Sequence, residues 1–213
     1  MFRIMGDVHG HLDFYTALVK DVDFSVQLGD MGFDYKKLID RLDPTKHRFV
    51  PGNHDNYDNL PPHAFQSDWG QVTMGGLDFF YIRGAYSVDK MYRIPHRSWW
   101  PQEEMEYRSA QQLIETVETL QPNIILSHDC PFVCYREGVL TNNYKIDPSF
   151  TTQMLSAVWE VCKPELWVFG HHHNDWTKKI EDTQFICLNE LSYLDVLTTD
   201  GHGRVGQMEL TPR

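Results

Sequence analysis

The sequence predicts an α/β fold built on mixed β-sheets. Short apolar runs alternate with amphipathic helical patterns in the first part of the chain, which is typical of parallel strands joined by helices. The last part contains apolar runs with no helix between them, which indicates antiparallel strands. The 213 residues most simply form one domain, 1–213, which is long enough to bury a large core.

The N-terminal region alternates between strand and helix patterns. Strands are predicted over 2–5 (FRIM), 23–29 (DFSVQLG) and 47–52 (HRFVPG), and helices over 11–20 and 35–42. The first helix is predicted because Leu12, Tyr15 and Val19 fall on one face. Pro51 and Gly52 end the third strand.

The middle of the chain contains a predicted hairpin and the longest predicted helix. QVTM (71–74) and LDFFYIR (77–83) flank Gly75-Gly76, a pair typical of a tight hairpin turn. Segment 84–100 shows no clear period. A helix is predicted from Gln102 to Leu120, because Pro101 and acidic residues lie at its start.

The C-terminal part returns to strands. NIILS (123–127) and ELWVFG (165–170) are predicted as buried strands, with a helix over Ser149–Val161 between them. QFICL (184–188) and SYLDVL (192–197) are predicted as antiparallel strands, which makes the sheet mixed.

The composition limits the range of partners. The formal net charge of −11 argues against a broad face for duplex nucleic acid, because phosphate backbones attract basic surfaces. No stretch approaches the roughly 20 apolar residues of a membrane helix. The four cysteines form no disulfide framework, so we expect a cytoplasmic protein with reduced thiols. Nothing in the sequence indicates an oligomeric state.

Polar clusters follow five of the predicted strands. They are GDVHG (6–10), GDMGFD (29–34), GNHD (52–55), HDC (128–130) and GHHHND (170–175). Sites in sheets with helical crossovers gather beyond the carboxyl ends of the strands. The sequence therefore predicts one site built from all five clusters.

The spacing within the clusters suggests which side chains face this site. Asp7 and His9 are two residues apart, as are His171 and His173, and such pairs point the same way in an extended segment. His172 would then face away. The adjacent Asn53 and His54 must diverge, so at most one of them is expected to be a ligand. A glycine precedes four of the candidates, and each suits a sharp turn and a close approach of the backbone: Gly6, Gly29, Gly52 and Gly170.

These side chains together predict a centre with two metal ions. The candidate ligands mix carboxylate, amide and imidazole without thiolate: Asp7, His9, Asp30, Asn53, His128, His171 and His173. That set suits Mn²⁺, Fe or Zn²⁺ better than Ca²⁺. Seven groups are too many for one four-coordinate ion but fit two ions that share a carboxylate. Such a site attracts phosphate and generates hydroxide near neutral pH.

In this order the clusters resemble the motifs of the calcineurin-like metallophosphoesterase superfamily, over Gly6 to His173. The resemblance implies a sandwich of two mixed β-sheets flanked by helices, with two metals at the strand ends. It gives the first metal Asp7, His9, Asp30 and His173, and the second metal Asp30, Asn53, His128 and His171. It also implies that His54 donates a proton to the leaving group or contacts the transition state.

One motif departs from the superfamily members that act as Ser/Thr protein phosphatases, which carry Gly-Asp-x-x-Asp-Arg-Gly. Phe33 stands in place of the second Asp, and no Arg follows. The acid that would pair with His54 is either missing or supplied by Asp34 or Asp55. The Gly-His-x-His ending is more similar to nuclease and phosphodiesterase members.

The segment 83–108 combines five basic residues with five aromatic residues. Cations beside aromatic rings suit a phosphate that carries a planar organic group. Arg93, Arg97, Trp99 and Trp100 are therefore candidate substrate-binding residues. The equally weighted alternative is a loop packed on the sheet, with both tryptophans as core residues.

We thus expect an enzyme that hydrolyses small phosphodiesters of nucleotide or aryl type with two divalent ions, most readily Mn²⁺, and a metal-bridging hydroxide. One alternative is a phosphomonoesterase or protein phosphatase. The other is a non-catalytic scaffold of the same fold.

Overall fold

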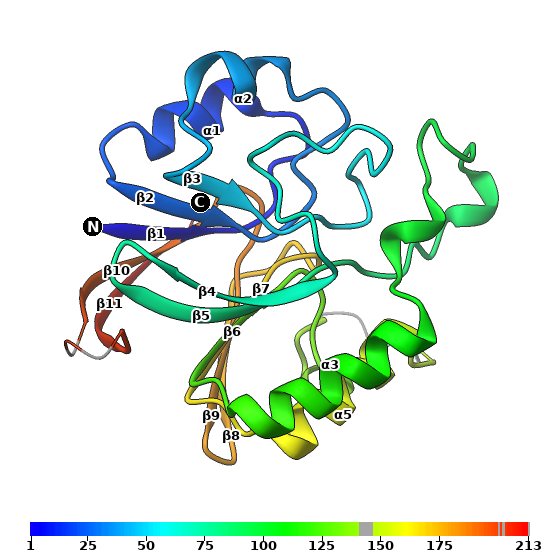
Figure 1. Cartoon of the computed structure of the whole chain (residues 1–213), viewed down its shortest axis with the longest axis vertical. Helices are drawn as coiled ribbons and strands as arrows, with labels where there is room; N and C mark the ends of the chain where they lie inside the picture. The colour runs from blue at the N-terminus through cyan, green and yellow to red at the C-terminus, as the bar shows by residue number, and fades with distance from the viewer. Residues whose placement is uncertain (141–146, 200, 202, 213) are drawn as a thin grey trace.

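Two mixed β-sheets pack face to face, and helices cover the outer face of each sheet (Figure 1). This computed structural model describes residues 1–140, 147–199, 201 and 203–212. The arrangement confirms the predicted fold class.

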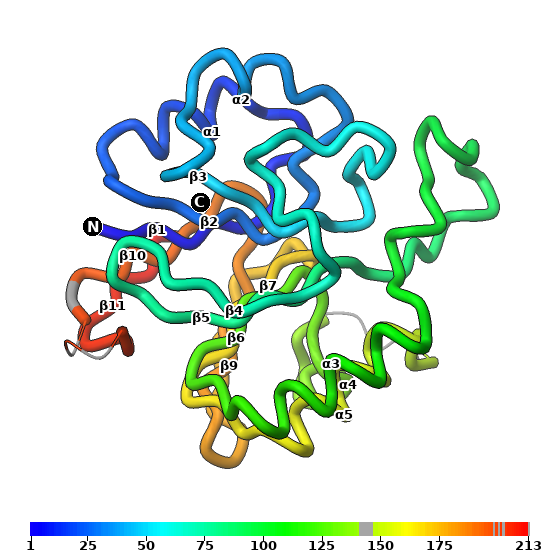
Figure 2. Tube along the Cα trace, in the orientation of Figure 1, coloured from blue at the N-terminus to red at the C-terminus, as the bar shows by residue number. Residues whose placement is uncertain are grey.

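The first sheet has five strands in the order β11-β10-β1-β2-β3. Its strands are β1 (Phe2–Met5), β2 (Phe24–Gln27), β3 (His47–Phe49), β10 (Tyr193–Thr199) and β11 (Val205–Thr211). β1, β2 and β3 are parallel, whereas β10 is antiparallel to β1 and to β11. The N-terminal strand thus lies beside a strand from the end of the chain (Figure 2).

The second sheet has six strands in the order β4-β5-β6-β7-β9-β8. Its strands are β4 (Trp69–Met74), β5 (Leu77–Ile82), β6 (Ile124–Ser127), β7 (Leu166–Phe169), β8 (Trp176–Ile180) and β9 (Thr183–Cys187). The four inner strands are parallel, and the antiparallel β4 and β8 form the edges.

Helices cover these sheets because each has one apolar stripe. α1 (Leu12–Val19) and α2 (Lys36–Arg41) bury Leu12, Tyr15 and Leu38 against the first sheet. α3 (Tyr107–Leu120), α4 (Phe132–Arg136) and α5 (Phe150–Val161) cover the second sheet. Between the sheets lies a third apolar layer, which includes Leu28, Val50, Leu126 and Val168.

Several predicted elements differ from those observed. The helix expected from Gln102 begins at Tyr107, because Glu103 and Glu104 accept hydrogen bonds from Ser87 and Thr151 and hold this stretch outside the helix. Every predicted strand is present, whereas the helix α4 and the strands β8 and β11 were not predicted. The two tail strands do not pair with each other. β9 runs parallel to β7, and β10 belongs to the other sheet.

Candidate metal centre

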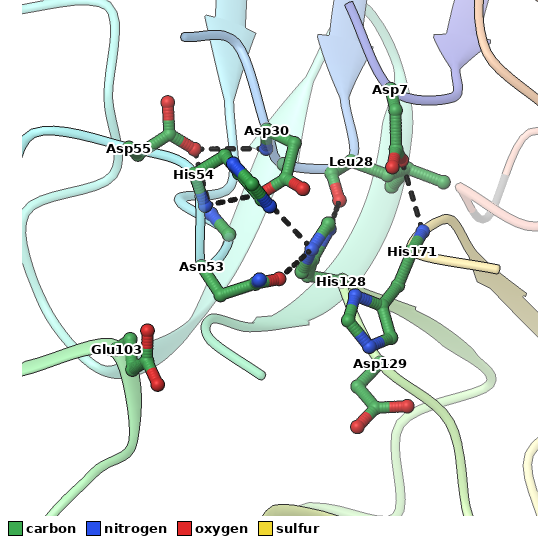
Figure 3. A network of polar contacts seen from close by, with 12 residues as sticks. Asp7, Leu28, Asp30, Asn53, His54, Asp55, Glu103, His128, Asp129 and His171 are labelled. Atoms are coloured by element: carbon green, nitrogen blue, oxygen red, sulfur yellow. Dashed lines mark hydrogen bonds and ion pairs between the residues drawn. The ribbon is translucent and has the colours of Figure 1, made fainter. Parts of the chain in front are cut away.

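The loops at the carboxyl ends of five strands bring the predicted ligands together. Asp7 follows β1, Asp30 follows β2, Asn53 follows β3, His128 follows β6, and His171 and His173 follow β7. Those that Figure 3 labels point toward one another across the interface between the two sheets. Their ligand atoms form overlapping groups in which all atoms lie within 4.8 Å of one another.

One group consists of Asp7, His9 and His173. The Nε2 atoms of the two histidines lie 2.8 Å apart. Asp7 Oδ2 lies 3.0 Å from His173 Nε2 and 3.5 Å from His9 Nε2. Three ligand atoms therefore face one small volume.

A second group consists of Asp30, His128 and His171, and Asn53 lies beside it. His128 Nε2 lies 3.2 Å from Asp30 Oδ1 and 3.0 Å from Asn53 Oδ1. His128 Nδ1 donates to the Leu28 carbonyl oxygen at 2.7 Å, so Nε2 is the ring nitrogen that faces Asp30 and Asn53 (Figure 3). The ring of His171 packs edge-on to that of His128, with centroids 4.9 Å apart.

Asp30 lies between the two groups. Its Oδ1 faces His128 at 3.2 Å, whereas its Oδ2 faces His9 Nε2 at 3.7 Å. A carboxylate with one oxygen toward each group is the arrangement that a bridging ligand requires.

The backbone at this centre is unusual. His9, Asp30, His171 and His173 have φ values of 47°, 58°, 66° and 47°. Non-glycine residues rarely adopt this left-handed conformation, and strained residues cluster at functional sites. The expectation that Asp7 with His9, and His171 with His173, converge as alternate residues of extended segments was wrong about the backbone, because no strand includes them. The pairs converge through left-handed turns.

Two glycines permit the close packing of the acidic ligands. A Cβ atom on Gly52 would collide with the Asp30 carboxylate, and a Cβ atom on Gly170 would collide with the Asp7 carboxylate. The prediction of close backbone approach at these glycines is confirmed.

The electrostatics of the centre favour cations. Asp7 and Asp30 are 0% and 1% exposed. Burial by itself would lower the pKa of His128, but the Asp30 carboxylate outweighs it and raises that pKa to about 10. Burial lowers the pKa of His171 to about 4, so this imidazole is a neutral potential ligand. The two buried carboxylates thus stabilise positive charge nearby, on a protonated histidine or on a bound cation.

These residues fit divalent metal ions. Asp7 Oδ2 is fully buried, and within the described residues it has no partner in hydrogen-bond geometry. A buried carboxylate oxygen in that state is costly unless it is paired or coordinates a metal. Carboxylate, amide and imidazole are ligands that suit Mn²⁺, Fe and Zn²⁺.

His54 lies at the edge of the centre. Its ring packs edge-on to His9, with centroids 5.2 Å apart. Arg93 Nη2 lies 2.6 Å from His54 Nε2, and Arg93 Nη1 donates to the Asn53 carbonyl oxygen at 3.1 Å. Because a guanidinium only donates, Nε2 is the acceptor in this arrangement.

Neither of the two candidate acids pairs with the side chain of His54 in the part of the chain that the structure describes. Asp55 accepts from the backbone N–H groups of Asp30, Gly32 and Gly52 and from the Tyr35 hydroxyl. Burial and the Asp30 carboxylate raise the pKa of Asp55 to about 7. Asp34 accepts from the Lys36 backbone N–H at 2.9 Å. Phe33 instead packs on His54, with ring centroids 6.2 Å apart.

The other predicted substrate residues do not gather at the centre. Trp100 is 1% exposed, and its Nε1 donates to Asp58 at 2.8 Å, so it lacks the free face that stacking on a substrate needs. It packs behind Phe33, at 5.4 Å between ring centroids. Trp99 is half-buried and Arg97 is exposed.

The residues that hold Asn53 in place through hydrogen bonds were not predicted from the sequence. Asn53 Nδ2 donates to Ser87 Oγ at 3.2 Å, and Ser87 donates through N and Oγ to the Glu103 carboxylate at 2.9 and 2.6 Å. No sequence signal distinguishes these two residues, because Ser87 lies in the segment 84–100 without a clear period and Glu103 is one of several acidic residues at the start of the predicted helix.

His172 faces away from the two ligand groups, as predicted. Its Nε2 lies 3.3 Å from Asp129 Oδ1 and 3.3 Å from Cys130 Sγ. The Tyr135 hydroxyl donates to the same carboxylate oxygen at 3.3 Å. This buried cluster supports the loop that presents His128.

Two cavities border the centre. The His54 cavity, of about 550 Å³, is lined by His9, Gly10, Leu12, Gly32, Phe33, Asp34, Lys37 and His54. The Tyr86 cavity, of about 360 Å³, is lined by Tyr86, Val88, Asp129, Phe132, Tyr135, Asp147, Pro148, Ser149, Thr152 and His171. The two share no lining residue. The His54 cavity is built by segments that follow β1, β2 and β3 of the first sheet. The Tyr86 cavity is built by segments that follow β5, β6 and β7 of the second sheet.

Comparisons with known proteins agree with this geometry. Residues 2–175 match the model of a family described as calcineurin-like phosphoesterase. The lariat debranching enzyme of Entamoeba histolytica is 26% identical over 95 residues, which cover 41% of this chain and 27% of that enzyme. The match thus spans about a quarter of the relative's length.

Solved structures share the fold. A dimetal phosphatase from Danio rerio has a TM-score of 0.56 and 15% identity, with 91% of each chain covered. A Staphylococcus aureus protein provisionally described as a 5′-nucleotidase has a TM-score of 0.54 and 13% identity. That match covers 99% of this chain and 53% of the other, so this chain spans about half its length. Among the described residues, no helix is long and apolar enough to cross a membrane.

Proposed function

This chain belongs to the calcineurin-like phosphoesterase family, and on that premise we propose that it is a metal-dependent hydrolase of small phosphodiesters that carry a planar group. The observation that carries the proposal is the position of Asp30, which presents one oxygen to each of two ligand groups.

In this proposal Asp7, His9, Asp30 and His173 hold one divalent ion. Asp30, Asn53, His128 and His171 hold the other. When bound, such a pair of ions polarises phosphoryl oxygens and lowers the pKa of water. Mn²⁺ suits the donor set because the set combines imidazole with hard oxygen and contains no thiolate.

The proposed role of His54 and Arg93 is at the leaving group. Hydrolysis joins a water oxygen to phosphorus and breaks the bond to the leaving oxygen, which gains a proton. His54 lies beside His9 and, because its Nε2 accepts from Arg93, can give that oxygen a proton or a hydrogen bond only through Nδ1. Arg93 touches His54 Nε2 and carries a permanent positive charge, so it both orients the imidazole and stabilises negative charge nearby.

Phe33 takes the stacking role that was expected of Trp100. Its side chain is 40% exposed and lines the His54 cavity, whereas Trp100 supports it from behind. A planar leaving group on this ring would gain about 1–3 kcal/mol.

The test is turnover of a substrate panel by protein loaded with Mn²⁺: 4-nitrophenyl phosphate, bis(4-nitrophenyl) phosphate, cyclic nucleotides and single-stranded oligonucleotides. We expect kcat/KM for the aryl diester to exceed that for the monoester at least tenfold. The opposite preference would make the protein a phosphomonoesterase. Absence of turnover with Mn²⁺, Fe²⁺ and Zn²⁺, despite full metal loading, would make it a scaffold.

A further inference from the structure

The Tyr86 cavity meets the candidate metal centre at His171, whereas His54 lies beside His9. His171, a candidate ligand, forms part of its wall. His9 and His54 form part of the wall of the His54 cavity. A group held at the metal centre is therefore in reach of both cavities, which share no residue.

The lining of the Tyr86 cavity is aromatic. Phe132 and Tyr135 stack on each other with centroids 5.7 Å apart, and Tyr86 is half-buried. Lys90 covers one face of Tyr86, with Nζ 4.4 Å from the ring centroid. The volume of about 360 Å³ lies within the range of roughly 300–1,000 Å³ that is usual for small-ligand sites.

The charge of this cavity limits what it can hold. Asp129 and Asp147 line it, and neither Lys nor Arg is among its described lining residues. Carboxylates repel a second phosphate and accept hydrogen bonds from amino and hydroxyl groups. The cavity therefore suits an uncharged planar group with hydrogen-bond donors, such as a nucleoside, or a simple aryl ring.

A phosphodiester has two substituents on phosphorus, one that leaves and one that stays. The His54 cavity contains the candidate proton donor, so it is the place for the substituent that leaves. We propose that the Tyr86 cavity binds the substituent that stays on phosphorus, and that this substituent is an uncharged planar group. This inference rests on the proposed function, because it assigns the two substituents of the proposed phosphodiester substrate to the two cavities beside the same centre.

In the reaction a water oxygen bonds to phosphorus while the bond to the substituent in the His54 cavity breaks. The departing oxygen takes a proton and leaves as an alcohol or phenol. The product that remains is a phosphomonoester with its organic group in the Tyr86 cavity.

The test compares two substrates with the same leaving group. Phenyl 4-nitrophenyl phosphate and methyl 4-nitrophenyl phosphate both release 4-nitrophenolate and differ only in the substituent that stays. A stacking contribution of about 1–3 kcal/mol predicts a kcat/KM about 5- to 150-fold higher for the phenyl ester. Tyr86→Leu, which keeps apolar bulk but removes the ring, should lower this ratio at least threefold.

Two matched variants test which cavity binds the substituent that stays on phosphorus. Phe33→Leu changes the His54 cavity and should leave the phenyl-to-methyl ratio as it is in the wild type. Phe14→Leu, at a residue 60% exposed outside both cavities, should do the same. A ratio that collapses in Phe33→Leu and persists in Tyr86→Leu would overturn the assignment.

A binding measurement separates this inference from the proposed function. Calorimetry on protein loaded with Mn²⁺ should show phenyl phosphate binding about 5- to 150-fold more tightly than methyl phosphate. Tyr86→Leu should reduce this difference. That result with no turnover would support the cavity assignment and reject catalysis. Equal affinities in the wild type, with turnover intact, would reject the cavity assignment and leave the proposed function standing.

Discussion

At the scale of single residues, the candidate centre combines strained backbone with buried charge. Four of the seven predicted ligands have left-handed backbone conformations, each of which costs roughly 1–3 kcal/mol. Asp7 and Asp30 are buried beside histidines that other elements supply. Such costs persist only where the surrounding structure enforces them.

Asp30→Asn should reduce metal binding more than any conservative change elsewhere. The amide keeps the shape of the side chain but removes the charge that faces both groups. We expect elemental analysis to give about two Mn²⁺ per wild-type chain and one or fewer per variant chain. Asp34→Asn, on an exposed side chain, is the matched control. A variant that still binds two ions would rule out the bridging role.

His54→Ala should keep the bound metal and lose about 10²–10⁴-fold in kcat. Arg93→Ala should also lower kcat, because Arg93 Nη2 contacts His54 Nε2 at 2.6 Å. The double variant should be less impaired than the product of the single effects, with a coupling of about 0.5–3 kcal/mol. Arg108→Ala, exposed on α3, is the control. Additive effects of the two substitutions would show that the residues act independently.

At the scale of elements, the segment 83–106 does more than cover the sheet. It extends beyond the sandwich at one side (Figure 1), yet Arg93 and Ser87 return from it to Asn53 and His54. Glu103 anchors Ser87 through two hydrogen bonds. The segment thus positions one candidate ligand, Asn53, and the candidate proton donor His54, whose own loop comes from the other sheet.

Trp100→Ala should mainly reduce stability. The side chain is 1% exposed and is held by Asp58 and Phe33, so its loss should cost about 3–5 kcal/mol of unfolding free energy. Thermal unfolding would show a lower midpoint, while the half-buried Trp99 changed to Ala should shift the midpoint less. A raised KM at an unchanged midpoint would instead restore Trp100 as a substrate contact.

Glu103 should make stability depend on pH. Burial raises the pKa of Glu103, so the folded protein keeps this proton to a higher pH than the unfolded chain does. The carboxyl group therefore contributes stability below its unfolded pKa and loses it as pH rises through the folded pKa. Glu103→Gln lacks this titration. Chemical unfolding between about pH 4 and pH 7 should show that the free energy of unfolding of the variant rises relative to that of the wild type as the pH rises. A difference in unfolding free energy that does not change with pH would contradict the role of the buried carboxyl group.

At the scale of the whole molecule, the candidate centre joins the two sheets. Asp7, Asp30 and Asn53 come from loops of the first sheet, whereas His128 and His171 come from loops of the second. Bound metal would therefore connect the two halves of the sandwich through side chains of both.

Removal of metal should lower the unfolding temperature. A ligand that binds only the folded state at 100 times its Kd stabilises that state by about 2.7 kcal/mol, which for a protein of this size corresponds to about 5–10 °C. Differential scanning fluorimetry with Mn²⁺ and with EDTA would measure the shift. Asp30→Asn should show a smaller shift. Equal midpoints with and without EDTA in the wild type would argue against metal at the sheet interface.

The sequence by itself determined the fold class and the ligand types. Strand–helix alternation and five polar clusters after strands predicted mixed sheets with a site at their carboxyl ends, because both signals are local and repeat along the chain. Gly52 and Gly170 were recognisable for the same reason, since each directly precedes a candidate ligand, although the carboxylates that they make room for, Asp30 and Asp7, lie on other loops.

Only the tertiary structure decided which residues surround the ligands. Trp99 and Trp100 are adjacent in sequence, yet only Trp100 is fully buried, because Phe33 and Asp58 from distant loops enclose it. The partner of His54 is Arg93 and not a neighbouring acid, because Asp55 is occupied by three backbone N–H groups from two loops. These outcomes depend on contacts between segments far apart in the chain, for which the sequence contains no local periodicity or motif.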